Sequence, residues 1–204
     1  MSVETVEKSS RIEMTTVIRH PAVVGAVLWW VGLAIEYPND LFPPGDGSVL
    51  YLVNGGIFLA AMTAWIVAIV RWRRERGAGA GRVALWGYSV WAIGFALLVL
   101  ATIITHLTQT DENVLFPVGG PTVVLGGIVV TVAALRADVP SRGRWAMVTL
   151  GLGWVVFFLI PPVLFGDVDP TWWTESLLGG LWFVAGALTA SRRPVRPVSP
   201  TIRR

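Results

Sequence analysis

The chain has 204 residues, of which 54% are hydrophobic and only 14% are charged, and it contains no cysteine. A soluble domain has about 25% charged residues, so this composition excludes a water-exposed surface of ordinary polarity and indicates a membrane protein. The absence of cysteine also excludes disulfides, thiolate metal sites and cysteine nucleophiles.

Six apolar segments lack Asp, Glu, Lys and Arg, and each approaches or exceeds the roughly 20 residues that a membrane-spanning helix needs. In chain order they are His20–Ile35 (extended by Arg19 and Tyr37), Val49–Val70, Val83–Thr110, Asn113–Leu135, Trp145–Gly166 and Ser176–Ser191, the last beginning near Trp172. The predicted fold class is therefore all-α: a polytopic membrane protein with six transmembrane helices.

The two ends of the chain differ from this apolar middle. Residues 1–19 are polar and of mixed charge, without the short apolar core and small-residue cleavage site of a secretory signal, so we expect the first apolar segment to stay attached. Residues 193–204 contain Pro194, Pro197 and Pro200, which prevent a continuing helix. We predict an N-terminal tail at 1–19, a transmembrane domain at 20–192 and a C-terminal tail at 193–204.

Charge is divided between the two sides that six crossings would create. All 16 Lys and Arg residues fall in the N-terminal tail, the Arg71–Arg82 connection, the Arg136–Arg144 connection or the C-terminal tail. The opposite side has no basic residue and eight acidic ones: Glu36, Asp40, Asp46, Asp111, Glu112, Asp167, Asp169 and Glu175. Because loops rich in Lys and Arg stay in the cytoplasm, we predict a multi-pass protein of the inner or plasma membrane with both termini cytoplasmic.

The concentration of arginine on one side indicates which partners contact that side. Topology and attraction to anionic lipid headgroups explain such a rim, and we favour them over docking of a nucleic acid or another acidic partner. A membrane-protein partner or a second copy of the chain is also compatible with the sequence.

Three glycine pairs recur early in the second, fourth and sixth predicted helices: Gly55–Gly56, Gly119–Gly120 and Gly179–Gly180. An outer acidic residue and a tryptophan precede each pair, and a run ending in arginine follows it: Asp46, Trp30 and Arg71; Asp111, Trp91 and Arg136; Asp169, Trp154 and Arg192. This order predicts three parallel two-helix hairpins at about residues 20–71, 83–136 and 145–192, with glycines that allow close helix packing. The alternative is that glycine, 22 residues of 204, is simply common in membrane helices.

Each hairpin also has a glycine in its first helix and a proline near the outer turn. With the glycine pairs these residues form three sets: Gly32, Pro38 and Gly55–Gly56; Gly94, Pro117 and Gly119–Gly120; Gly153, Pro161 and Gly179–Gly180. Over residues 20–192 the chain thereby resembles the HdeD-like acid-resistance membrane proteins, which have six helices in short two-helix repeats. Pro117 departs from their pattern because it follows the outer turn. The resemblance implies a six-helix repeat fold and an envelope stress role, and it supplies no catalytic residue.

Few residues could carry chemistry. The only two histidines, His20 and His106, lie near opposite ends of their helices, which argues against a zinc protease motif and against a bis-histidine haem. A haem with one histidine ligand stays open. No ionisable residue falls at mid-membrane, where coupled transporters usually keep one. We therefore predict no catalytic residue, no cofactor and no bound metal.

The outer side holds the one candidate cluster. Its predicted members are His106, Asp111, Glu112, Glu36, Asp46 and Asp169. If the hairpins pack in a ring, these residues converge and could bind a cation, attract cations to a pore, or sense pH through the histidine. The alternative is a solvated anionic rim that topology alone leaves behind.

Tryptophans and prolines give two further expectations. The 11 tryptophans are predicted to form interfacial belts and lipid-facing packing, with Trp72 as an anchor at the arginine-rich side. The Pro161–Pro162 pair is predicted to bend or end the fifth helix before its outer edge.

The leading functional hypothesis is a non-enzymatic membrane protein with a role in envelope stress or partner assembly. A small-solute or ion channel with an acidic outer vestibule is the alternative, and a lipid- or quinone-modifying enzyme is the third. A continuous polar cavity would favour transport, a closed bundle would favour assembly, and a lipid-facing cleft beside His106 would favour the enzyme.

Overall fold

A computed structural model describes residues 16–41, 47–110, 113–165 and 172–190, and for residues 141 and 156–165 the backbone alone. This part of the chain contains no β-strand. Its long helices are α2 (Pro21–Asn39), α3 (Val49–Arg74), α4 (Arg82–Thr108), α5 (Leu115–Arg136), α6 (Ser141–Phe165) and α7 (Trp172–Ala190). The all-helical class is confirmed, and among the described residues α2, α3, α4 and α5 are long and apolar enough to cross a membrane.

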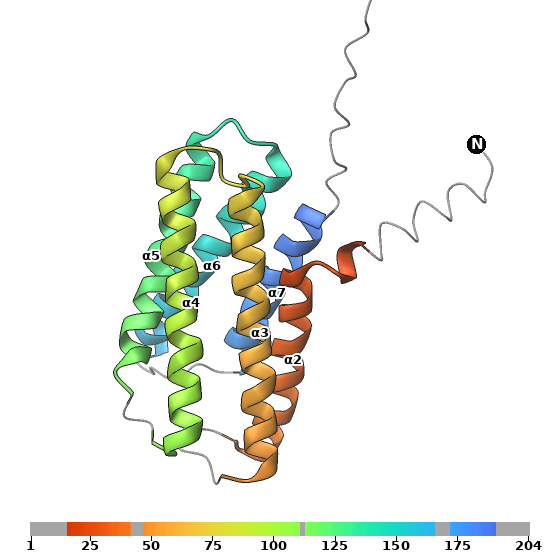
Figure 1. The fold of residues 1–204 in the computed structure, drawn as a ribbon, viewed down its shortest axis with the longest axis vertical. Coiled ribbons are helices and arrows are strands. Elements are labelled where there is room, and N and C mark those ends of the chain that lie inside the picture. The colour runs from red at the N-terminus through yellow and green to blue at the C-terminus, as the bar shows by residue number, and fades with distance from the viewer. Residues whose placement is uncertain (1–15, 42–46, 111–112, 166–171, 191–204) are drawn as a thin grey trace, which may run out of the picture.

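The helices pack as a closed ring in chain order. Each helix contacts the next along the chain, and α7 returns to contact α2 (Figure 1). The α3–α4 and α5–α6 connections lie at the upper end of Figure 1, and with the adjoining helix ends they are rich in arginine: Arg71, Arg73, Arg74, Arg76 and Arg82 at the first, and Arg136, Arg142 and Arg144 at the second. The C-terminal ends of α2 and α4 and the N-terminal ends of α3 and α5 lie at the opposite end. The fold therefore separates these arginine-rich connections from the helix ends near Glu36 and His106.

Local capping explains where the first two helices begin. His20 is the N-cap of α2, where its side chain accepts a hydrogen bond from the Ala22 amide, and Pro21 follows at the first helical position. Ser48 caps α3 by accepting from the Tyr51 amide. Both are residue types that suit these positions, because a side-chain acceptor satisfies an amide that has no partner within the helix.

The fifth predicted helix departs from expectation at its prolines. We expected Pro161–Pro162 to bend or end it, but α6 continues through both residues to Phe165, so the prediction of an earlier end is wrong. Packed membrane helices tolerate internal proline when neighbouring groups satisfy the freed backbone carbonyls.

Most tryptophans on α3, α4, α6 and α7 face the inside of the ring, which corrects the belt prediction. Five are buried: Trp65, Trp72, Trp91, Trp154 and Trp182. The expectation that Trp72 is an interfacial anchor is wrong, since its side chain is 1% exposed. These helices are apolar on every side, so hydropathy alone does not tell a lipid-facing indole from a core one.

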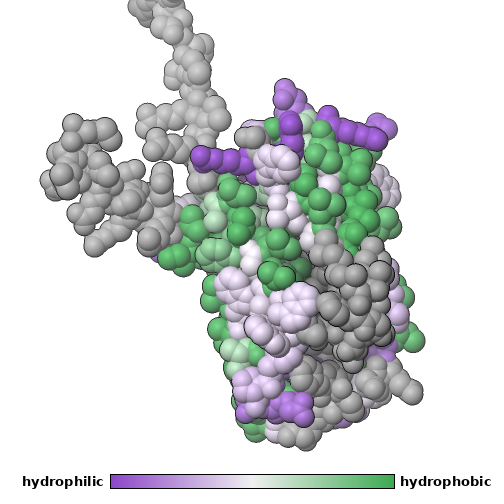
Figure 2. All heavy atoms as spheres, turned by 180° about the vertical axis from the view of Figure 1, so that it is seen from behind, coloured by the Kyte–Doolittle hydropathy of each residue, from purple (hydrophilic) through white to green (hydrophobic). Residues whose placement is uncertain are grey.

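Four other tryptophans lie on the surface, and for them the belt stays a prediction. Trp86, Trp145, Trp172 and Trp173 are exposed. On the face drawn in Figure 2, hydrophilic residues gather at the two ends and hydrophobic ones cover much of the surface between them. This distribution is the one that a membrane-embedded bundle requires.

Glycines bring α4 and α5 close together. A Cβ added to Gly94 would lie 2.6 Å from the Val123 amide nitrogen, and one added to Gly126 would collide with the backbone of Trp91. Any larger residue at these positions would force the helices apart, as expected where small residues set interhelical distance.

The predicted glycine pairs are not equivalent. A Cβ on Gly55 would collide with the His106 ring, one on Gly119 would lie 2.9 Å from Leu98 Cδ2, and one on Gly179 would lie 2.8 Å from Trp30 Nε1. Gly120 is buried. Gly180 has only an ordinary contact, at 3.9 Å to Trp30, and Gly56 is exposed, with no atom of the described residues within 4 Å of an added Cβ. The prediction of a close-packing role is therefore wrong for Gly56 against the part of the chain that the structure describes.

Candidate functional site

The predicted outer cluster lies mostly outside the described residues. Asp46, Asp111, Glu112 and Asp169 belong to the parts of the chain that are not described, which leaves His106 and Glu36. Within the described ranges no three His, Asp or Glu side chains come together to hold a metal ion. Cation binding and pH sensing by the full cluster stay predictions.

His106 lies in an aromatic and backbone environment between α3 and α4. Its ring stacks on Tyr51, with centroids 4.5 Å apart and planes at 13°. Its Nδ1 is 2.8 Å from the Thr102 carbonyl oxygen, and because that oxygen only accepts, Nδ1 carries the proton. Gly55 leaves the space that the ring occupies. The candidate histidine and Gly55, the first residue of the first glycine pair, thus pack together.

Glu36 lies within electrostatic range of a second carboxylate at the seam between α2 and α7. The Tyr37 hydroxyl donates a hydrogen bond to the Glu175 side chain, and Glu36 is near enough to interact with Glu175 electrostatically. Both glutamates are half-buried. Sequence reasoning placed Glu175 on the outer side but missed this pairing, because 139 residues separate the two glutamates.

Two adjacent indoles join the same seam a turn or two deeper. Trp29 Nε1 donates to the Glu175 carbonyl oxygen at 3.0 Å, and Trp30 Nε1 donates to the Ser176 carbonyl oxygen at 2.9 Å. Gly179 leaves room for the Trp30 ring beside these bonds. The first and last helices are therefore pinned together by hydrogen bonds that close the ring.

A second polar contact closes the seam at the arginine-rich end. Trp72 Nε1 donates to Thr189 Oγ1 at 3.1 Å, and the Thr189 hydroxyl donates to the Ala185 carbonyl oxygen at 2.7 Å. His20 Nε2 lies 3.5 Å from the same Thr189 oxygen, and the His20 ring stacks on Trp72 with centroids 5.8 Å apart. Three helices, α2, α3 and α7, meet at this point. The sequence contains one signal near this contact. Pro21 is typical of the first position of a helix, and His20 directly precedes it.

The environment of His20 favours its neutral form. The side chain lies just outside α2 and is 1% exposed. Burial, with Arg71 nearby as the second cause, lowers the pKa of His20 below its ordinary value. The Nδ1 atom accepts the capping bond from Ala22, so the remaining proton is on Nε2, which faces Thr189. Protonation would place a charge in a buried site and remove the helix cap.

The centre of the ring is filled by indole and phenyl rings around Trp182. The Trp182 ring stacks on Trp65 with centroids 4.7 Å apart and planes at 9°, and on Trp72 at 5.7 Å. Trp91 lies 5.6 Å away and Phe95 closes the cluster edge-on. The indole N–H groups of Trp65, Trp91 and Trp182 are buried and have no hydrogen-bond partner among the described residues. Contacts with the faces of neighbouring rings are the interactions that such N–H groups can make here.

Comparison with family models, with curated proteins and with solved structures gives no match.

Proposed function

We propose that this chain is a six-span integral membrane protein of the inner or plasma membrane, built from three parallel hairpins with both termini in the cytoplasm. Its role is non-enzymatic: it assembles with a membrane-protein partner or with a second copy of itself, in the manner of an envelope stress protein such as those of the HdeD-like type. Support comes from the ring of helices and from the arginine-rich connections that share one end.

The filled centre of the ring carries this proposal. A channel or facilitator requires a polar path between its helices, and here Trp182 occupies the middle of the bundle with Trp65 and Trp91 packed against it. Hydrophobic rings with buried N–H groups offer no site for a hydrated ion. A closed bundle can interact with other molecules only through its outer surface. This favours assembly with a partner over transport through the centre.

The outer surface has a feature that suits assembly. Gly56 and Ala60 lie four residues apart on the same exposed face of α3, where no residue of the described ranges packs against Gly56. Small residues with this spacing let a second helix approach closely in lipid, where packing replaces the hydrophobic effect as the driving force.

A channel is the second candidate, favoured by one observation. Glu36 and Glu175 come together near the outer end of the seam between α2 and α7. A pair of carboxylates at a bundle end can attract cations to a mouth. For an enzyme acting on lipid or quinone, the described residues supply no comparable observation.

Flux through reconstituted vesicles separates the two candidates. We expect purified protein in liposomes to pass potassium, protons and glycerol no faster than protein-free vesicles, with gramicidin as the positive control for ion flux. The readouts are an entrapped pH dye, a potassium-selective dye and light scattering. Protein-dependent flux that scales with the protein-to-lipid ratio would refute the closed-bundle proposal and favour the channel.

A further inference from the structure

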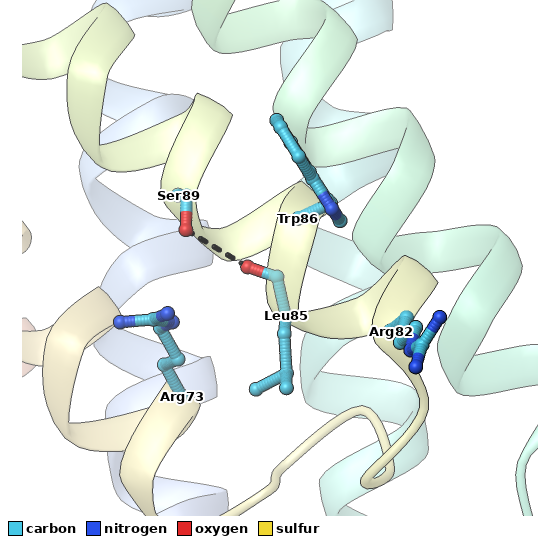
Figure 3. Close-up of a pocket in the computed structure, with 5 residues that line it drawn as sticks. All are labelled: Arg73, Arg82, Leu85, Trp86 and Ser89. Atoms are coloured by element: carbon cyan, nitrogen blue, oxygen red, sulfur yellow. Dashed lines mark hydrogen bonds between the residues drawn. The ribbon is translucent and has the colours of Figure 1, made fainter.

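A pocket of about 460 Å³ opens between α3 and α4 at the arginine-rich end of the bundle. Figure 3 shows its lining: Arg73 comes from α3, while Arg82, Leu85, Trp86 and Ser89 come from α4. The four α4 residues are spaced i, i+3, i+4 and i+7, so they share one face of the helix. The neighbouring residues Gly87, Tyr88 and Trp91 face the core. The pocket therefore lies on the outside of the ring.

The charge of the pocket is uncompensated. Within the described residues neither Arg73 nor Arg82 has a carboxylate partner, whereas Arg71 is paired with Glu75 at 2.7 Å. Helix α4 begins at Arg82, and its N-cap Gly81 has no side chain to satisfy the first amides. The positive end of the helix dipole adds to the two guanidinium groups, so the pocket favours an anion, and phosphate is one of the two anionic groups, with carboxylate, that arginine binds in a bidentate way.

The rest of the lining is apolar and faces outward. Trp86 is 72% exposed, and Leu85 lies between the two arginines in the view of Figure 3. The Ser89 hydroxyl donates to the Leu85 carbonyl oxygen at 2.9 Å, so its proton is already engaged within the helix. A ligand that fits both the two arginines and the apolar lining must join an anionic group to an apolar body. Exposed tryptophan next to arginine is typical of the headgroup level of a membrane.

We infer that this pocket binds the headgroup of an acidic glycerophospholipid from the cytoplasmic leaflet. Arg73 and Arg82 hold the phosphate, and the lipid's glycerol and first acyl carbons lie along Leu85 and Trp86. The inference rests on the proposed membrane orientation, which places this end of the bundle in the leaflet that carries anionic lipids. The volume lies within the usual range for small-ligand pockets, about 300–1,000 Å³.

Native mass spectrometry of the full chain tests the site with defined lipids. The protein is delipidated in detergent and titrated with phosphatidylglycerol or with phosphatidylcholine. We expect the double variant Arg73→Gln/Arg82→Gln to bind phosphatidylglycerol roughly 10- to 25-fold more weakly than wild type, the product of roughly three- to fivefold for each arginine. The matched control is Arg74→Gln/Arg76→Gln, which removes the same charge from exposed arginines outside the pocket. The control should change affinity less than twofold.

Two further experiments test whether the bound phosphate belongs to a lipid or to a soluble compound, and where the lipid lies. Water-soluble glycerol 3-phosphate at millimolar concentration should not displace phosphatidylglycerol, because it lacks the apolar body. Brominated phosphatidylglycerol should quench the tryptophan fluorescence of wild type more than that of Trp86→Phe. Equal loss in the two double variants, or equal binding of phosphatidylglycerol and phosphatidylcholine, would overturn the inference. Either outcome leaves the vesicle flux result unchanged, so failure of the lipid site is distinguishable from failure of the closed-bundle proposal.

Discussion

Replacing Trp182 by alanine should lower the free energy of unfolding by about 3–5 kcal/mol, the range for removing a fully buried tryptophan. Trp182 is 0% exposed and its ring contacts Trp65, Trp72 and Trp91. In a bundle surrounded by apolar solvent, most of this loss comes from dispersion contacts that the cavity leaves unmade. Unfolding by sodium dodecyl sulfate in mixed micelles, followed by circular dichroism, measures the difference.

Trp145→Ala is the matched control for this substitution. Trp145 is 58% exposed, so its removal leaves no cavity and should cost less than about 1 kcal/mol. Trp182→Phe, which keeps part of the ring contact area, should fall between the two alanine variants. If Trp182→Ala and Trp145→Ala were equally stable, the indole cluster would not be the core of the bundle.

Acidification should destabilise the protein through His20. Burial lowers the pKa of His20 in the folded state. Below the ordinary histidine pKa of about 6.5 the unfolded chain takes up a proton that the folded chain resists, so stability falls as the pH drops through this range. With about 1.4 kcal/mol for each unit of pKa lowering, we expect a loss on the order of 2 kcal/mol between pH 7 and pH 4.5.

The variant His20→Asn isolates this contribution. Asparagine is a good N-cap residue, so it keeps an acceptor for the Ala22 amide without a titratable group. Thermal melts in detergent at a series of pH values should show a shallower acid dependence for His20→Asn than for wild type. Parallel curves for the two proteins would show that His20 does not titrate on unfolding.

The helix positions could be predicted from the sequence because charges mark their ends. The predicted segment Val49–Val70 became α3 at Val49–Arg74, and Val83–Thr110 became α4 at Arg82–Thr108. Charged residues are excluded from the apolar interior, so their positions in the sequence delimit each helix to within a turn or so.

The orientation of side chains within the ring could not be predicted. A soluble helix has a polar face that identifies its buried face, but these helices are apolar all round. Trp72 and Trp86 both lie near the arginine-rich end, yet Trp72 is 1% exposed and Trp86 is 72% exposed. The difference in exposure depends on which helices pack next to each other. The hydropathy pattern of one helix does not contain that information.

Contacts of the last helix with α2 and α3 could not be predicted from the sequence either. Residues 146 positions apart form the Trp29–Glu175 and Trp30–Ser176 hydrogen bonds, and Thr189 meets Trp72 across 117 positions. For the candidate site, the sequence predicted a histidine near the end of its helix, and His106 lies in the last turn of α4. Its observed neighbours, Tyr51 and Gly55, were not predicted, because its expected partners were the acidic residues of the following loop.

Cysteine accessibility tests the membrane orientation on which the proposed function depends. The chain has no native cysteine, so each introduced thiol is a unique label. The four sites, one in or next to each of four connections, are Ala80→Cys, Thr108→Cys, Asp138→Cys and Asp169→Cys. With an impermeant maleimide on intact cells, positions 108 and 169 should be labelled, and positions 80 and 138 should react only after the membrane is permeabilised. Labelling of position 80 or 138 in intact cells, or of 108 and 169 on opposite sides, would contradict six crossings with a cytoplasmic arginine-rich end.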